Sequence, residues 1–376
     1  MALFDESVAV VPVPRRRMPR GTVVGVWALT VALLVLLVIT FLPTSYVIQR
    51  PGPVYNTLGT AAAADGTQVP LISVEGAETF ETAGSLDLTT VQVVGNRERT
   101  PSWFELATAW LDPSKAVVPL SSVFPEGQTS DQRNEQNATL MVDSQQEATA
   151  AALTELGYDV GSSVRVVEFV KDSPAEGVLE PDDVIVSADG TPIDEADTLR
   201  DVIKDGGGDP VELVVLRNGT EQTVTVTPES REIEGEETWI IGVVLIHDYD
   251  FPIDVTIQLD NVGGPSAGMM FALGIVDTLT PDELNGGKDV AGTGTIDAEG
   301  IVGPIGGIRQ KLYGARDAGA EYFLAPDRNC DEVVGHIPNG LRVFSTATLE
   351  DSITALDAIA AGGDLDALPT CTGAAS

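Results

Sequence analysis

A serine at position 266 lies in a segment that favours nucleophilic chemistry. It belongs to the run GGPSAG at residues 263–268, which leads directly into an apolar stretch predicted to form a helix over residues 269–279. The first two turns of that helix are apolar on all sides, which predicts burial. Backbone N–H groups at the start of a helix lie at its positive dipole end and stabilise an oxyanion. Ser266 is therefore either a nucleophile, supported by its neighbours Gly264 and Ala267, or an ordinary N-cap.

A nucleophilic serine needs a base, and Lys311 is the best candidate. The helix predicted over residues 307–318 has one apolar face, formed by Ile308, Leu312 and Ala315. Lys311 falls on the flank of this face at 100° per residue, whereas Arg309 points to the other side. Burial lowers the pKa of a lysine, so that it becomes neutral near pH 7, as a general base must be. The alternative is a lysine whose amine reaches water, and neither His247 nor His336 lies in a recognisable triad motif.

Together the two motifs resemble the proteolytic domain of the Lon family, which uses a Ser-Lys dyad. By this resemblance the GPSAG run supplies Ser266 as the nucleophile, and the PIGG-x-x-x-K pattern supplies Lys311 as the base. The intervening run GTGT implies that Thr293 hydrogen-bonds the lysine and keeps it oriented. The family's glutamate at this strand end is replaced here by Thr295. The resemblance therefore implies acyl transfer by Ser266 and Lys311, without a role for that carboxylate.

Composition excludes several other classes of chemistry and of partner. Two Cys and two His exclude a four-cysteine zinc site and a histidine-rich centre, so neither a metal nor a cofactor is expected. No G-x-x-x-x-G-K-[ST] phosphate loop occurs, and the 376 residues leave no room for an ATPase module. The net charge of −36 argues against nucleic-acid binding. We therefore expect an enzyme that works without ATP and without nucleic acid.

A second region, residues 164–228, reads as short strands separated by turns. Asn218-Gly219 between two β-branched runs indicates a hairpin. The region resembles a PDZ domain, and the resembling runs are DSPA at 172–175, DDVI at 182–185 and DG at 189–190. PDZ domains bind extended peptides by strand addition and often capture a C-terminal carboxylate. The sequence does not locate the carboxylate loop, because residues 158–161 match the hydrophobic-glycine pattern only loosely.

The N-terminal region contains a candidate membrane span. Residues 22–42 carry no charge and form a 21-residue apolar stretch, about 31 Å long as a helix and so matched to a hydrocarbon core of about 30 Å. The alternative is a cleaved signal peptide, whose apolar core is normally 7–15 residues and is followed by an A-x-A-like site. Four arginines precede the stretch, at positions 15, 16, 17 and 20. By the positive-inside rule the N-terminus is cytoplasmic and the body is outside a cell membrane crossed once.

The only two cysteines, Cys330 and Cys371, would then lie on the oxidising side of the membrane. We predict a disulfide between them, with two separate thiols as the alternative.

The predicted fold class is α+β, with a transmembrane helix and a Lon-type proteolytic domain into which a PDZ domain is inserted. The runs at residues 84–94 and 140–157 resemble the opening strands and first helix of the Lon domain, and residues 125–137 read as a polar loop. The predicted domains are a cytoplasmic N-terminus at 1–20, a transmembrane helix at 21–43, a stalk and first part of the Lon-like domain at 44–160, the PDZ domain at 161–229 and the Lon-like domain with the catalytic pair at 230–376.

These features predict a membrane-anchored, extracytoplasmic serine endopeptidase that is independent of ATP. Its partners would be protein or peptide substrates with extended or unfolded segments, recognised by the PDZ domain. The sequence is compatible with both a monomer and a homo-oligomer. The main alternative is a non-catalytic, membrane-tethered PDZ adaptor whose Lon-like domain is only a folding partner. A further alternative is a sensor that cuts one membrane-adjacent partner. The presence of both Ser266 and Lys311 favours the enzyme over the adaptor.

Overall fold

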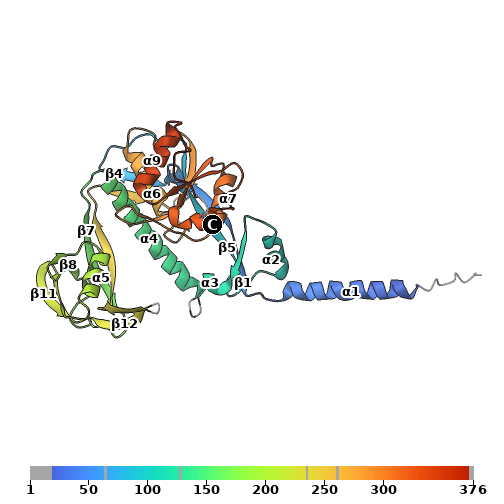
Figure 1. Ribbon diagram of the computed structural model, residues 1–376, viewed down its shortest axis with the longest axis horizontal. Helices are drawn as coiled ribbons and strands as arrows, with labels where there is room; N and C mark the ends of the chain where they lie inside the picture. The colour runs from blue at the N-terminus through green and yellow to red at the C-terminus, as the bar shows by residue number, and fades with distance from the viewer. Residues whose placement is uncertain are drawn as a thin grey trace, which may run out of the picture. The chain divides into compact units, whose positions relative to one another are not determined.

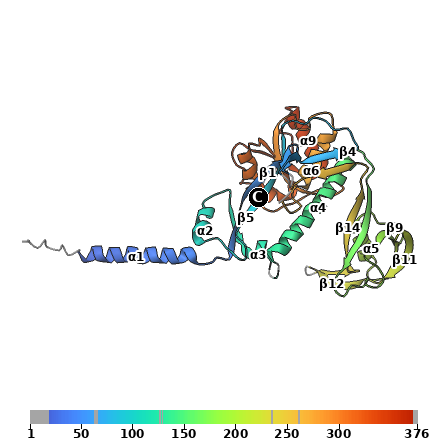
Figure 2. The same ribbon diagram turned by 180° about the vertical axis from the view of Figure 1, so that it is seen from behind.

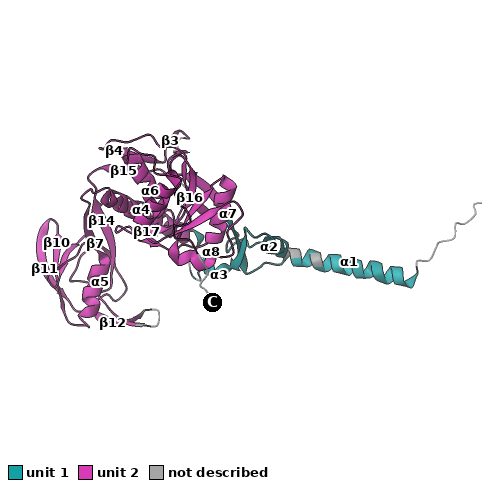
Figure 3. Cartoon of the chain, turned by 45° about the horizontal axis from the view of Figure 1, so that its top comes forward, with its two compact units in different colours: residues 1–50, 93–130 teal, residues 51–92, 131–376 magenta. Residues whose placement is uncertain are grey.

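The computed structural model describes residues 19–62, 66–125, 127, 129–233, 236–259 and 262–371. The predicted cytoplasmic segment, with Arg15, Arg16 and Arg17, lies outside these residues except for its last two positions. The chain divides into two compact units, coloured teal and magenta in Figure 3. Unit 1 comprises residues 1–50 and 93–130, and unit 2 comprises residues 51–92 and 131–376.

Unit 1 begins with the apolar helix α1 (Arg20–Phe41). Residues 20–39 of this helix have a mean hydropathy of 2.8, and the helix is long and apolar enough to cross a membrane. The remaining elements of the unit are α2 (Trp103–Trp110), β6 (Ala116–Pro119) and α3 (Leu120–Val123). Strand β1 (Tyr46–Asn56) begins in unit 1, where its first four residues pair antiparallel with β6. The extended segment predicted after the span is therefore a paired strand.

Helix α2 is defined by its cap and by a small apolar core. Ser102 and Glu105 form a capping box, which satisfies the first free amides of the helix. Leu106 and Ala109 are buried against Ile48 and other apolar side chains of unit 1. One face of α2 is thus packed against the rest of unit 1.

The main sheet of unit 2 has the strand order β20-β19-β16-β5-β1. Its strands β1 and β5 are labelled in Figure 1. Its further strands are β5 (Ser85–Val94), β16 (Asp289–Gly292), β19 (Tyr322–Pro326) and β20 (Arg342–Thr346). Strand β16 runs parallel to both β5 and β19, and β19 runs parallel to β20. Strands from both halves of the chain therefore share one sheet.

The same part of unit 2 contains five helices: α4 (Ser130–Glu155), α6 (Gly268–Leu279), α7 (Ile308–Ala318), α8 (Cys330–Val333) and α9 (Leu349–Ala360). Residues 268–277 of α6 are all buried, as its uniformly apolar sequence predicts. The polar loop predicted at residues 125–137 is wrong from Ser130 onward, because that segment is the first part of α4. Its Gln, Glu and Arg residues are good helix formers, and a solvent-facing helix needs no apolar periodicity.

A second sheet is formed by the chain between β5 and β16. Its order is β11-β10-β8-β7-β14, with β9 (Thr191–Pro192) paired to β8 and helix α5 (Ala196–Asp205) beside it. The strands are β7 (Gly161–Phe169), β8 (Val184–Ala188), β10 (Val211–Arg217), β11 (Thr220–Val226) and β14 (Val243–Asp250). The predicted hairpin at Asn218-Gly219 is confirmed as the β10–β11 turn. Figure 2 shows β7 and β14 side by side, and β14 lies beyond the boundary predicted at residue 229.

Short two-stranded pairs complete the described strands of unit 2. They are β2 (Thr60–Ala62) with β3 (Gln68–Pro70), β4 (Ile72–Glu75) with β15 (Asp254–Ile257), β12 (Glu229–Ile233) with β13 (Glu236–Ile240), and β17 (Thr295–Ile296) with β18 (Val302–Gly303).

Candidate active site

Ser266 lies in the turn that precedes α6. The N-cap of that helix is Ala267, and no side chain caps it, so the interpretation of Ser266 as an ordinary N-cap is wrong. The Ser266 hydroxyl instead lies 2.7 Å from the amine of Lys311. Residues far apart in the sequence thus meet at this hydroxyl.

Lys311 reaches Ser266 from the buried side of α7. Its side chain is among the largest that are fully buried, and the residue is 2% exposed. The alternative in which its amine reaches water is therefore wrong. Burial removes the water that stabilises an ammonium ion, and it lowers the pKa of Lys311 to about 7. The amine hydrogen-bonds Ser266 Oγ and Thr293 Oγ1, which are both neutral hydroxyls.

Thr293 connects the two residues. It follows β16 directly and is completely buried. Its hydroxyl donates to the carbonyl oxygen of Ser266 at 2.8 Å and accepts from Lys311 Nζ at 2.8 Å. Because the single hydroxyl proton is used on the carbonyl, this oxygen can only accept from the amine. Thr293 therefore fixes both the backbone that carries Ser266 and the orientation of Lys311.

Two glycines shape the backbone around these side chains. Gly264 has φ of +89°, in the region that side-chain-bearing residues rarely adopt, and its N–H donates to the carbonyl of Asn137 in α4 at 2.9 Å. Gly307 is the N-cap of α7 with φ of +72°, and a Cβ there would lie 2.7 Å from a methyl carbon of Val91. Gly264 thus supports the site through its backbone conformation, while its own amide is already engaged.

A cavity of about 350 Å³ opens onto Ser266, Lys311 and Ala267. Its other walls come from β1, β5, α4 and the turns before α6 and α7, and they are Pro53, Tyr55, Thr89, Thr90, Val91, Gln92, Met141, Val262, Gly263 and Gly306. The sequence motifs did not identify the wall residues of β1, β5 and α4, because these share no local pattern with the serine run. The cavity is large enough for a side chain beside the Ser266 hydroxyl.

The two histidines have partners elsewhere. His247 on β14 accepts a hydrogen bond from the amide of Ala196 and lies near the carboxylates of Glu147 and Glu195. His336 Nδ1 contacts the carbonyl of Val334. Their described contacts give no triad with Ser266.

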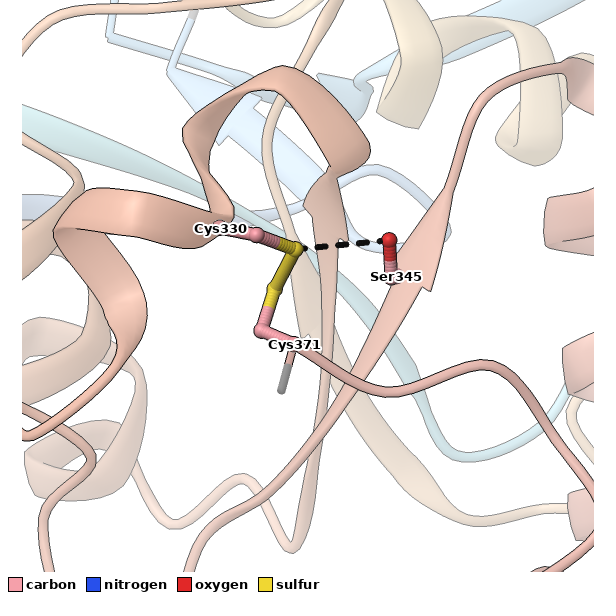
Figure 4. Close-up of a disulfide and its surroundings, with 3 residues drawn as sticks. All are labelled: Cys330, Ser345 and Cys371. Atoms are coloured by element: carbon pink, nitrogen blue, oxygen red, sulfur yellow. Dashed lines mark hydrogen bonds between the residues drawn. A yellow bond between two sulfur atoms is a disulfide. The ribbon is translucent and has the colours of Figure 1, made fainter. Parts of the chain in front are cut away.

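Cys330 and Cys371 form a disulfide, which Figure 4 shows beside the hydroxyl of Ser345. The two residues are 41 positions apart, so the bond closes a loop that contains β20 and α9. It lies outside the cavity at Ser266.

The second sheet contains a different cavity, of about 250 Å³, between α5 and the segment 239–245. Its walls are almost entirely apolar, and they are Val170, Ala196, Leu199, Arg200, Ile203, Trp239, Ile240, Ile241, Gly242, Val243 and Leu245. The run Ile241-Gly242-Val243 has the hydrophobic-glycine pattern that the sequence search sought at residues 158–161. This pattern could have been found in the sequence, but it lies just beyond the domain boundary predicted at residue 229.

Two family profiles match this chain. Residues 254–357 match the Lon protease (S16) C-terminal proteolytic domain, and residues 133–227 match the PDZ domain. The first range contains Ser266, Thr293 and Lys311. The chain is thus a mixed helix and strand protein with a Lon-type proteolytic domain, a PDZ domain and an N-terminal apolar helix.

Two relatives are each similar to about a quarter of this chain. Lon protease 2 of Herpetosiphon aurantiacus is 39% identical over 94 residues, which are 24% of this chain and 11% of that protein. The Lon protease of Geobacter metallireducens is 35% identical over 106 residues, 27% of this chain and 13% of that protein. This chain therefore spans about an eighth of the length of these relatives. The matches support a serine peptidase.

Among solved structures, the PDZ domain of an SdrC-like protein from Listeria innocua is 24% identical, with a TM-score of 0.20, and the match covers 22% of this chain and 92% of that one. The equivalent domain from Listeria monocytogenes is 25% identical with a TM-score of 0.20, over 22% of this chain and 86% of that one.

Proposed function

We propose that this chain is a membrane-anchored serine endopeptidase in which Ser266 is the nucleophile and Lys311 is the general base. The observation that carries the proposal is the 2.7 Å contact between Lys311 Nζ and Ser266 Oγ at the floor of a cavity, with a lysine pKa of about 7. A base whose pKa lies near the working pH combines a large neutral fraction with useful basicity.

The hydrogen-bond directions around the amine support this role. Thr293 accepts one amine hydrogen, since its own proton is used on the Ser266 carbonyl. In the neutral amine the lone pair is then free to accept the proton of the Ser266 hydroxyl. The contact that holds the two groups together is thus also the path of the proton.

The proposed reaction is acyl transfer. Lys311 takes the proton of Ser266, and the serine oxygen attacks a peptide carbonyl carbon to form a tetrahedral oxyanion. We assign oxyanion binding to the backbone amides of the turn before α6, with Ala267 as the residue after the nucleophile. Lys311 then returns the proton to the leaving amine, and water hydrolyses the acyl-enzyme with the lysine again as base.

We further propose that the second cavity recognises substrate rather than transforming it. Strand β14 is the edge of its sheet, so an extended peptide can add to it as a further strand. The apolar walls contributed by α5, such as Leu199 and Ile203, offer a site for an apolar peptide side chain. The two cavities would then divide recognition and hydrolysis between them.

Membrane anchoring, an extracytoplasmic body and independence of ATP complete the proposal. They are supported by the length and hydropathy of α1, by the arginines that precede it and by the disulfide of Cys330 and Cys371. The sequence contains no G-x-x-x-x-G-K-[ST] loop that would hold a nucleotide phosphate.

The test of the proposed enzyme is covalent labelling of the full-length protein with a serine-reactive fluorophosphonate, combined with cleavage of an unfolded protein without nucleotide. We expect the wild type to be labelled and to cleave, and Ser266→Ala to do neither. Ser230→Ala, which removes a serine that hydrogen-bonds Glu237 and does not line the cavity, is the matched control and should behave as wild type. A wild-type protein that folds but is neither labelled nor active would favour the PDZ adaptor.

A further inference from the structure

Helix α2 exposes a contiguous apolar face. Trp103 is 37% exposed, Phe104 67%, Trp110 62% and the C-cap residue Leu111 86%. At 100° per residue these four side chains fall in a sector about 120° wide. The buried residues Leu106 and Ala109 lie outside that sector. The exposed apolar face is therefore separate from the face that attaches α2 to unit 1, which leaves it available to a partner.

The start of α2 is tied to the end of α1. Thr44 is buried, its hydroxyl donates to the carbonyl of Pro101 at 2.8 Å, and its amide donates to Thr100 Oγ1 at 3.2 Å. Pro101 is adjacent to Ser102, the N-cap of α2. Phe41 ends α1, so the path from that residue to Thr44 is at most about 10 Å even when fully extended. If α1 spans a membrane, the first turn of α2 must lie close to the membrane surface.

Charge separates this region from the rest of the chain. The part of unit 1 that follows α1, residues 42–50 and 93–130, carries 4 basic and 4 acidic residues, whereas unit 2 carries 13 basic and 51 acidic residues. An anionic leaflet repels a strongly acidic body and tolerates a nearly neutral one. The acidic residues next to the apolar face are also engaged, because Glu105 caps α2 and Asp112 pairs with Lys115 at 2.9 Å. Unit 1 is therefore the part of the chain that is suited to a lipid surface.

We propose that the face formed by Trp103, Phe104, Trp110 and Leu111 lies in the interfacial layer of the bilayer that α1 spans. Tryptophan is enriched in this layer because its ring is apolar and its N–H is polar, and amphipathic helices bury their apolar face there to about 5–10 Å. Unit 1 is then held to the membrane at two points, by α1 and by α2. The inference rests on the proposed membrane anchor.

The four tryptophans of the chain provide native reporters for a test. Full-length single-tryptophan variants, with the other three changed to Phe, are reconstituted in vesicles of phosphatidylcholine and phosphatidylglycerol that carry bromine at a known depth. Trp27 in α1 reports insertion of the span, Trp103 and Trp110 report α2, and Trp239 in unit 2 is the control. We expect Trp27 to be quenched by deep bromines, Trp103 and Trp110 to lose about half of their emission to bromines near the headgroups, and Trp239 to be unaffected.

The possible outcomes separate this inference from the anchor. Quenching of Trp27 without Trp103 or Trp110 would overturn the α2 contact and leave the anchor standing, whereas no quenching at any position would remove both. Equal quenching of Trp239 would show that the effect is not specific to α2. A different result would assign the face to a second copy of the chain instead. In that case bromine would not quench Trp110, and the protection of Trp110 from aqueous iodide would increase with protein concentration.

A second set of variants tests the face by its chemistry. In the background with Trp110 as the single tryptophan, Phe104→Ser combined with Leu111→Ser should reduce headgroup-level quenching several-fold. Ile337→Ser, which removes an exposed apolar side chain from unit 2, is the control and should leave the quenching unchanged. Equal quenching in both variants would reject the proposed face.

Discussion

The two cavities of unit 2 differ in what their walls can do. The cavity at Ser266 holds a fully buried amine between two hydroxyls, and this environment lowers the pKa of Lys311. The cavity beside α5 is apolar, and the one charged residue among its described walls, Arg200, is exposed and pairs with Asp197. A lysine must be desolvated to accept a proton near pH 7, whereas recognition of a peptide by strand addition uses an apolar surface and a strand edge. The comparison predicts that substitutions in the first cavity abolish chemistry and that those in the second change substrate choice.

The largest effect should come from the base itself. Lys311→Arg keeps the charge, but a guanidinium stays protonated at accessible pH and cannot accept the serine proton. We expect loss of at least about 10³-fold in cleavage, as in Ser266→Ala, because the members of such a pair act as a unit. Arg309→Ala, on the exposed side of the same helix, should remain active. Substantial serine-dependent turnover in Lys311→Arg would remove the lysine from the mechanism.

Substitution of Thr293 should have the next largest effect. Thr293→Val keeps the shape but removes the acceptor for Lys311 and the donor to the Ser266 carbonyl. A displacement of either group by about 1 Å costs on the order of 10²-fold in rate. Thr293→Ser should restore most of the activity, and kcat should fall more than KM changes in the valine variant. An unchanged kcat in Thr293→Val would show that this hydroxyl does not position the base.

The pH dependence of cleavage reports the same amine. With a pKa of about 7, Lys311 is mostly neutral at pH 8 and mostly protonated at pH 6. The rate should therefore be about tenfold lower at pH 6 than at pH 8. The measurement is kcat/KM of a short peptide across this range. A rate that is flat between these values would contradict a titrating base at this position.

Folding stability should follow the same titration. The lysine pKa is lowered from 10.5 in the unfolded chain to about 7 in the folded one, so the unfolded state binds more protons between these values. The free energy of unfolding should therefore rise with pH across this interval, relative to Lys311→Met, which has no amine to titrate. Denaturant unfolding of both proteins at pH 7 and pH 9 measures the difference. Parallel curves would indicate that the amine is not desolvated.

The smallest effect is expected in the second cavity. Val243→Glu places a charge in the apolar wall at the start of the edge strand β14, and it should weaken cleavage of a protein substrate about fivefold, for a loss of about 1 kcal/mol in binding. Hydrolysis of a short unstructured peptide should be unchanged, because Ser266 and Lys311 are untouched. Val186→Glu, at an exposed position on β8 outside the cavity, is the matched control. Equal losses for both substrates would mean that this domain supports the active site structurally.

Local sequence patterns were sufficient to predict the elements whose contacts are local. The buried helix after Ser266, the burial of Lys311 on the packed side of α7 and the hairpin at Asn218-Gly219 all follow from residues within a few turns of one another. The same reasoning failed at Ser130, where a polar helix has no apolar periodicity to reveal it. The predicted PDZ domain, which ends at residue 229, also omitted strand β14. This edge strand pairs with β7, about 80 residues earlier in the chain, and no local pattern predicts that pairing.

The sequence by itself determined which residue types were present for the proposed acyl transfer, and it predicted the helix that follows Ser266 and the helix that carries Lys311. Only the tertiary structure decided that Lys311 reaches Ser266 across 45 positions, that Thr293 links them, and that segments before and after the second sheet together enclose the cavity. The physical reason is that the hydrogen bond between the hydroxyl and the amine depends on the distance between them, and the lowered pKa of the amine depends on the exclusion of water. Both depend on packing between segments that carry no pattern in common.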